Sequence, residues 1–163
     1  MIRTEFEMAT KEVFPHNLDA EKSVLAACML NEEWSKVAIP QLTQNHFLNL
    51  SHQSVFIAMK VLHEKGRPVD QLTVRDYLRA KGSKVSDVEV LELSDNHFSL
   101  TSCSYHLEIL KRCELQRRLI RFAVDLKGMA ETSHEDIESV RKQALELMMP
   151  LLTDDVPSAE NKQ

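Results

Sequence analysis

Two amphipathic helical stretches in the last third of the chain constrain its fold most strongly. Apolar side chains recur at intervals of four and three residues in both stretches, 103–130 and 137–152. Such spacing is typical of helices that pack side by side as in a coiled coil. The polar break at 131–136, where Ser133 can cap the second helix, is too short to do anything but turn the chain back. We therefore predict a long antiparallel helical hairpin. We call its apolar stripe the seam: Leu115, Leu119, Phe122, Leu126 and Met129, then Ile137, Val140, Ala144, Leu147 and Leu151.

Each helix of the predicted hairpin carries a second apolar edge beside the seam. A lone pair of helices can cover one apolar stripe on each helix, so the second edge requires another surface. We expect that surface to be a second copy of the chain or a partner protein. The second edge consists of Ile109, Cys113, Ile120, Ala123 and Val124 on the first helix, and Leu145, Met148 and Leu152 on the second.

The rest of the sequence also favours helices. Three glycines and five prolines in 163 residues provide few of the turns that a sheet requires, whereas good helix formers are abundant. We predict an all-α fold, with a small globular helical bundle at 15–100 followed by the hairpin at 101–152. Residues 1–14 and 153–163 show no periodicity, so we expect a flexible arm and a disordered tail.

Start and stop signals divide the predicted bundle into five short helices. They cover 18–30, 32–42 and 51–65, a fourth helix that ends at 81, and a fifth that runs through 93. Glu21 lies in the first turn of the first helix, where a carboxylate complements the partial positive charge of a helix N-terminus. The signals are Asn17 and Asn31 as caps, Asp70 or Thr73 as the cap of the fourth helix, a Ser86–Glu89 capping box, Gly66 and Gly82 as stops, and Pro40, which should shorten the second helix.

The charge of the chain argues against polyanion binding by the domain as a whole. The formal net charge is -5 and the isoelectric point is about 5.8. The exception is a basic cluster that falls mainly opposite the first half of the seam, and a solvated helix face is the expected explanation of such a cluster. Contact with nucleic-acid phosphates is the alternative. The cluster consists of Lys111, Arg112, Arg117, Arg118 and Arg121.

No set of residues predicts catalysis. None of the three glycines opens a phosphate-binding loop of the Walker A type, so we do not expect ATP hydrolysis by this chain alone. The histidines are scattered, and no serine or cysteine lies in a nucleophile elbow. Cys103, His106 and Cys113 share a helix face, but the last lies about 10 Å further along the axis, too far for one metal ion. We expect no catalytic residue, no cofactor and no metal.

The sequence also favours a cytoplasmic protein. No apolar run approaches the length of a membrane span, and Glu5 and Glu7 stand where a signal peptide would have its apolar core. The odd number of cysteines at irregular spacings agrees with a reducing compartment.

Several separate segments, in order, resemble the N-terminal domain of DnaB-type replicative DNA helicases. The resemblance covers roughly residues 15–152, and its motifs are specific in combination although each is weak alone. The matching segments are Pro15-His16-Asn17-Leu18-Asp19-Ala20-Glu21-Lys22-Ser23-Val24-Leu25, Asn45-His46-Phe47 with His52 and Val55-Phe56, Gly66-Arg67-Pro68-Val69-Asp70 with Thr73-Val74 and Leu78, and His106-Leu107-Glu108-Ile109-Leu110 with Arg117 and Leu119-Ile120.

The resemblance implies a helical bundle followed by a hairpin, with hairpins that pair between subunits in a collar on the hexameric helicase. It also implies contacts with primase and, in some systems, with helicase loaders. The sequence departs from the family at Ala26-Ala27, where Gly-Gly is common, and it lacks a Gly-Gly-x-x-Tyr-Leu segment before the hairpin. The RecA-like ATPase half is absent from the sequence.

Three functions therefore remain open. The first is a protein–protein interaction module of DNA replication, part of a primosome, that self-associates through the hairpin and contacts helicase, primase or loader. The second is a freestanding regulator, a loader or an inhibitor, that binds a replicative helicase; Met1 and the polar ending favour a complete small protein of this kind. The third, direct DNA binding through residues 112–121, is not expected from the net charge.

Overall fold

The computed structural model describes residues 14–95, 99–132 and 136–153. In these residues the fold is all-α, as the sequence predicts, and contains no strand. The chain divides into two compact units, Met1–Glu114 and Leu115–Gln163. Residues 1–13 of the predicted arm (1–14), the predicted cap Ser133 and residues 154–163 of the predicted tail (153–163) lie outside the described residues.

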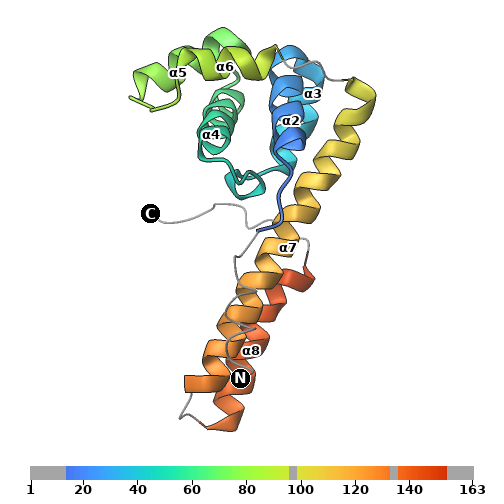
Figure 1. The fold of residues 1–163 in the computed structure, drawn as a ribbon, viewed down its shortest axis with the longest axis vertical. Helices are drawn as coiled ribbons and strands as arrows, with labels where there is room; N and C mark the ends of the chain where they lie inside the picture. Colours follow the sequence, from blue (N-terminus) through green and yellow to red (C-terminus); the bar gives the residue numbers. More distant parts are fainter. Residues whose placement is uncertain (1–13, 96–98, 133–135, 154–163) are drawn as a thin grey trace, which may run out of the picture. The chain divides into compact units, whose positions relative to one another are not determined.

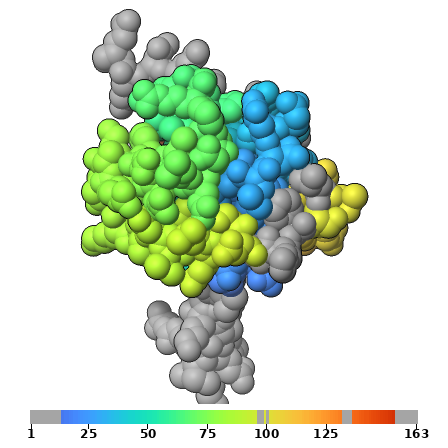
Figure 2. Space-filling model, turned by 90° about the horizontal axis from the view of Figure 1, so that it is seen from above, coloured from blue at the N-terminus to red at the C-terminus, as the bar shows by residue number. Residues whose placement is uncertain are grey.

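The first unit is a bundle of short helices joined to the beginning of a long one (Figure 1). Helix α2 (Leu18–Leu30) contacts α3 (Glu32–Ala38), α4 (Leu50–Glu64) and α6 (Asp87–Ser94), and α4 contacts α5 (Gln71–Ala80). In the space-filling view the α2–α3 segments (blue) and the α4–α6 segments (green) pack directly against one another (Figure 2). The elements are α2 (Leu18–Leu30), α3 (Glu32–Ala38), η1 (Ile39–Gln41), η2 (Gln44–His46), α4 (Leu50–Glu64), α5 (Gln71–Ala80), α6 (Asp87–Ser94) and the first part of α7 (Leu100–Thr132).

The predicted caps are confirmed. Oδ1 of Asn17 accepts a hydrogen bond from the backbone N–H of Ala20 at 2.9 Å, and Oδ1 of Asn31 accepts one from the backbone N–H of Trp34 at 2.8 Å. Asp70 with Thr73, and Ser86 with Glu89, form reciprocal capping boxes at the starts of α5 and α6. Gly66 and Gly82 have φ of 62° and 64°, the left-handed conformation that ends a helix. Pro40 shortens α3 as expected and lies in η1.

One hydrophobic core runs through the first unit. Its largest side chains include Phe47 and Phe56, whose rings stack with centroids 4.9 Å apart. Leu107 and Leu110 of α7 belong to the same core. We expected the hairpin to begin at 101, but α7 contributes to the bundle core up to Cys113, and the division between the units falls after Glu114.

A buried carboxylate joins α2 to the start of α4. Glu21 is fully buried, and its Oε1 accepts a hydrogen bond from the backbone N–H of Leu48 at 2.7 Å. Its Oε2 lies 2.6 Å from Nδ1 of His52 and 3.4 Å from the backbone nitrogen of Asn49. A buried charge is tolerated when its hydrogen bonds are satisfied, and here they are. Glu21 therefore does more than complement its own helix: it ties two helices together.

The second unit contains the rest of α7 and the whole of α8 (Ile137–Leu152). The bounds of α8 are those predicted, and α7 extends the predicted helix by a few residues at each end. Within the described residues, no helix is both long enough and apolar enough to span a membrane.

Candidate interaction surface on the helical hairpin

Helices α7 and α8 run antiparallel in the second unit, as the short break between them predicted (Figure 1). The guanidinium of Arg118 on α7 donates a hydrogen bond to the backbone carbonyl of Pro150 on α8. Phe122, one turn further along α7, lies with Leu147 and Leu151 of α8 around one pocket. The hydrogen bond places Arg118 opposite Pro150, and the pocket brings seam residues of both helices together.

Pairing with α8 leaves the seam only partly covered. Phe122, Met129, Val140, Ala144 and Leu151 are half-buried, and in the described part of the unit no apolar side chain is buried. Leu115, Leu119, Leu126, Ile137 and Leu147 are exposed; Leu119 keeps 46 % of its surface in contact with solvent. At about 100° per residue, Leu119 and Leu126 lie to one side of Phe122 on α7, beyond the stripe that α8 covers.

The second apolar edge divides between the two units. Val124, Leu145 and Leu152 are exposed, the last at 68 %, and Ile120 and Met148 are half-buried. Ile109 and Cys113 are only 8 % and 6 % exposed and belong to the core of the first unit. We expected these two at an interface with another chain, and the structure corrects this because the bundle itself covers that part of α7.

The five basic residues do not form one patch. Nζ of Lys111 lies 3.3 Å from the Glu108 carboxylate and 2.9 Å from the amide oxygen of Gln41. Arg117 is only 3 % exposed, and Arg118 is held by the Pro150 carbonyl. Arg112 and Arg121 remain exposed. Two exposed cations nine positions apart make a poor phosphate-binding surface, so the structure gives no support to direct DNA binding.

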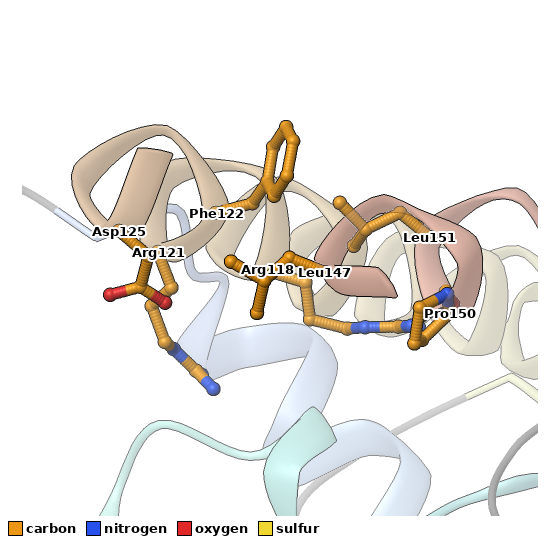
Figure 3. Close-up of a pocket in the computed structure, with 7 residues that line it drawn as sticks. All are labelled: Arg118, Arg121, Phe122, Asp125, Leu147, Pro150 and Leu151. Carbon is orange, nitrogen blue, oxygen red and sulfur yellow. Dashed lines mark hydrogen bonds between the residues drawn. The ribbon is translucent and has the colours of Figure 1, made fainter. Parts of the chain in front are cut away.

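A pocket of about 240 Å³ lies between α7 and α8 (Figure 3). Phe122, Leu147 and Leu151 supply apolar walls, and the rim carries charged groups from α7. The pocket is smaller than the roughly 300–1,000 Å³ typical of cofactor and substrate sites. Its full lining is Arg118, Arg121, Phe122, Asp125, Leu147, Pro150 and Leu151.

The reactive side chains of the first unit are engaged in packing. Burial, together with the neighbouring Cys103, raises the pKa of the Cys28 thiol to about 12. Burial also raises the pKa of Cys103, and Nδ1 of His106 lies 2.7 Å from Oγ of Ser23. Thiols with raised pKa values stay protonated at neutral pH, and only the thiolate is a nucleophile or metal ligand. These residues therefore fit a packing role.

Pro150 is the feature of the hairpin that sequence reasoning missed. It lies inside α8, where its ring nitrogen cannot donate to the carbonyl of Glu146. The helix nevertheless continues to Leu152, and Arg118 satisfies the carbonyl of Pro150 from the other helix. The Pro150 carbonyl lies in the last turn of α8, where carbonyls have no donor within the helix, and Arg118 supplies one from α7.

The chain matches the family model described as "DnaB-like helicase N terminal domain" over residues 13–112. The match covers well over half of the 163 residues. The chain belongs to this family. The suspected resemblance is thus confirmed, and it places the chain among DNA-replication proteins. The match covers the helical N-terminal domain and not an ATPase domain.

Relatives of this DnaB-like chain include proteins named replicative DNA helicases. It is 34 % identical over 114 residues to the replicative DNA helicase DnaB of Buchnera aphidicola subsp. Baizongia pistaciae. The match covers 67 % of this chain and 24 % of that protein. It is 28 % identical over 138 residues to the replicative DNA helicase DnaC of Bacillus subtilis. That match covers 83 % of this chain and 30 % of that protein. The chain therefore spans about a quarter to a third of the length of these relatives.

A solved structure shares the fold of this DnaB-like chain. The N-terminal domain of DnaB helicase from Mycobacterium tuberculosis superimposes with a TM-score of 0.75 at 23 % identity, covering 83 % of this chain and 97 % of that one. At this identity the likeness shows the fold alone.

Proposed function

We propose that this chain is a protein–protein interaction module of DNA replication that self-associates through its hairpin. In this proposal it works in the cytoplasm, without catalysis of its own, and contacts a replicative helicase, a primase or a helicase loader. The supporting observation is the apolar surface of α7 and α8 that the hairpin leaves exposed, led by Leu119 and Leu126. Large exposed apolar patches on a soluble domain mark interaction sites. Similarity to proteins named replicative DNA helicases supplies the setting.

The proposed interface is the seam together with Ile120, Val124 and Met148 of the second edge. Full burial of a leucine contributes about 1.5–3 kcal/mol, so completing the burial of a half-exposed one contributes about 1 kcal/mol. Leu115, Leu119 and Leu126 on both chains would together contribute about 6 kcal/mol, against an association cost of about 4–15 kcal/mol. Residues of α8 must therefore take part. The interface comprises Leu115, Leu119, Ile120, Phe122, Val124, Leu126, Met129, Ile137, Val140, Ala144, Leu147, Met148 and Leu151.

A charge introduced into this surface tests self-association. Replacing Leu119 and Leu126 together by Glu places two carboxylates where apolar contact is required, so the variant should be a monomer by static light scattering when the unaltered chain is a dimer or larger. Leu50→Glu is the matched control, because Leu50 is 77 % exposed on α4 in the other unit. Its mass should equal that of the unaltered chain.

A variant that keeps the mass of the unaltered chain would rule out these leucines as the interface. Circular dichroism must first show that all three proteins have the same helical content, so that loss of fold is not read as loss of association.

The same surface supports a second proposal, a freestanding regulator of a replicative helicase. A hairpin that pairs with its own copy has the apolar pattern to pair with the related hairpin of a helicase as well. Purified full-length helicase should then be retained by the immobilised chain and lost with the Leu119/Leu126 double variant. Retention of helicase by the double variant at the unaltered level would contradict this proposal.

A further inference from the structure

The two units differ in how firmly apolar burial holds their helices together. In the first unit, Leu25, Val55 and Phe56 are at most 1 % exposed, whereas no apolar side chain is buried in the described part of the second unit. Apolar burial is the main favourable term in folding, and elements with few buried contacts are the ones that open locally. The hairpin should therefore open far more often than the first unit unfolds.

Two residues that weaken helices lie within the helices of the hairpin. Gly128 is part of α7, where an added Cβ would meet no atom within 4 Å, and Pro150 is part of α8. Glycine within a helix is less favourable than alanine, and Pro150 lacks the N–H that would bond to the carbonyl of Glu146. The glycines of the first unit, Gly66 and Gly82, instead follow the ends of α4 and α5. Local sequence thus adds to the weakness of the hairpin.

Helix α8 is the part of the hairpin that is most easily released. The second half of α7 continues a helix whose first turns belong to the core of the first unit, so it needs no nucleation of its own. Helix α8 starts separately at Ile137 and has 16 residues, barely more than the roughly 12–15 below which isolated helices are marginal in water. Its stability therefore depends on its contacts with α7, where Phe122, Leu147 and Leu151 line one open pocket (Figure 3).

We infer that α8 is a detachable helix, which opens from α7 in the single chain and is held closed by self-association. This inference rests on the proposed function, in which a second copy covers the apolar side chains of the closed hairpin. A second copy that binds only the closed form stabilises that form by mass action. Opening of α8 and association of the chain are therefore linked, so that assembly changes the dynamics of the hairpin as well as the mass of the particle.

Hydrogen–deuterium exchange of the full chain, read by mass spectrometry, measures the opening of each helix. Amides of α8 should exchange about tenfold more slowly at a chain concentration about ten times the dissociation constant than in the diluted, dissociated chain. The Leu119/Leu126 double variant should show the fast rate at both concentrations. Amides of α4 should exchange at one rate in all samples. Exchange detects openings in a small fraction of molecules, so the double variant keeps its helical content by circular dichroism and still differs in exchange.

Pro150→Ala tests the weakness of α8 without association. Introduced into the double variant, it supplies an N–H for the carbonyl of Glu146 and keeps the backbone carbonyl to which Arg118 donates. Amides of α8 should then exchange about fivefold more slowly, the effect of one backbone hydrogen bond, while those of α4 keep their rate. An unchanged rate in α8, or an equal change in α4, would overturn the assignment of α8 as the helix that opens by itself.

Sedimentation equilibrium of the same samples separates the failure of this inference from the failure of the proposed function. If the unaltered chain associates but α8 exchanges equally fast in the associated and dissociated states, the detachable helix is overturned and self-association stands. If the chain stays single at every concentration, self-association is overturned, and exchange in α8 as slow as that in α4 would overturn the detachable helix as well.

Discussion

Among single residues, Glu21 is a buried carboxylate that joins two helices of the first unit. Its carboxylate is fully buried and is within hydrogen-bonding distance of Leu48, Asn49 and His52. Glu21→Ala leaves these donors unpaired in the interior, so we expect the free energy of unfolding to fall by about 3–5 kcal/mol. Glu21→Gln keeps one acceptor oxygen and should cost less. Urea denaturation followed by the fluorescence of Trp34 measures both.

Glu33→Ala is the control for this prediction, because Glu33 is an exposed carboxylate whose partner is the exposed Lys36. The control should unfold at the urea concentration of the unaltered chain. Equal midpoints for Glu21→Ala and Glu33→Ala would show that the buried carboxylate does not hold α2 to α4.

At the scale of single elements, the start of α6 depends on an ionised capping residue. Glu89 accepts hydrogen bonds from the backbone N–H of Ser86 at 2.7 Å, from Oγ of Ser86 at 2.9 Å and from Oγ of Ser51 at 3.0 Å. These bonds, first those from Ser86 and then that from Ser51, lower the pKa of Glu89 below its ordinary value of 4.5. Because the folded pKa is the lower one, this contribution is present above pH 4.5 and is lost as the pH falls through the folded pKa.

Glu89→Gln should therefore lower the free energy of unfolding at pH 7 by about 0.5–1 kcal/mol, a value kept small because the site is open to solvent screening. The difference from the unaltered chain should shrink as the pH falls below 4.5. Thermal unfolding between pH 7 and pH 3 measures this difference in stability. Glu92→Gln is the control, because Glu92 is exposed on α6. A Glu89→Gln difference that stays constant across this range would exclude a role for the ionised form.

The elements also show which features can be predicted from sequence. Asn17, Asn31, Asp70 and Ser86 act on neighbours three residues away, so their roles as caps follow from the local sequence. The bounds of α8 follow from periodicity for the same reason. The burial of Glu21 could not be predicted, because its partners lie 27 to 31 residues along the chain.

The candidate interface could be predicted only in part. Periodicity identifies the apolar stripes of α7. It does not show which surface covers which part of a stripe. Ile109, Cys113 and Val124 lie on one face of α7, yet the first two are in the bundle core and the third is exposed. The sequence likewise does not show which charged residues are buried. Arg112 and Arg117 look alike in the sequence, but Arg112 is exposed and Arg117 is buried.

At the scale of the whole molecule, the two units bury their apolar residues to very different extents. The first unit has a continuous core that includes the start of α7, although some of its apolar side chains, such as Leu50, remain exposed. The second unit is a helix pair whose apolar side chains are at best half-buried among the described residues. Two helices alone provide too little apolar burial for independent stability, so the hairpin should gain stability from a further surface. We therefore expect the hairpin to associate with another copy of the chain.

Sedimentation equilibrium of the unaltered chain measures this association, because the mass it yields is independent of molecular shape. One chain has a mass of 18.7 kDa. We predict a mass of twice that value, or a higher multiple, at micromolar concentration, with dissociation toward the single-chain mass on dilution. A single-chain mass of 18.7 kDa at every concentration up to the solubility limit would contradict self-association through the hairpin.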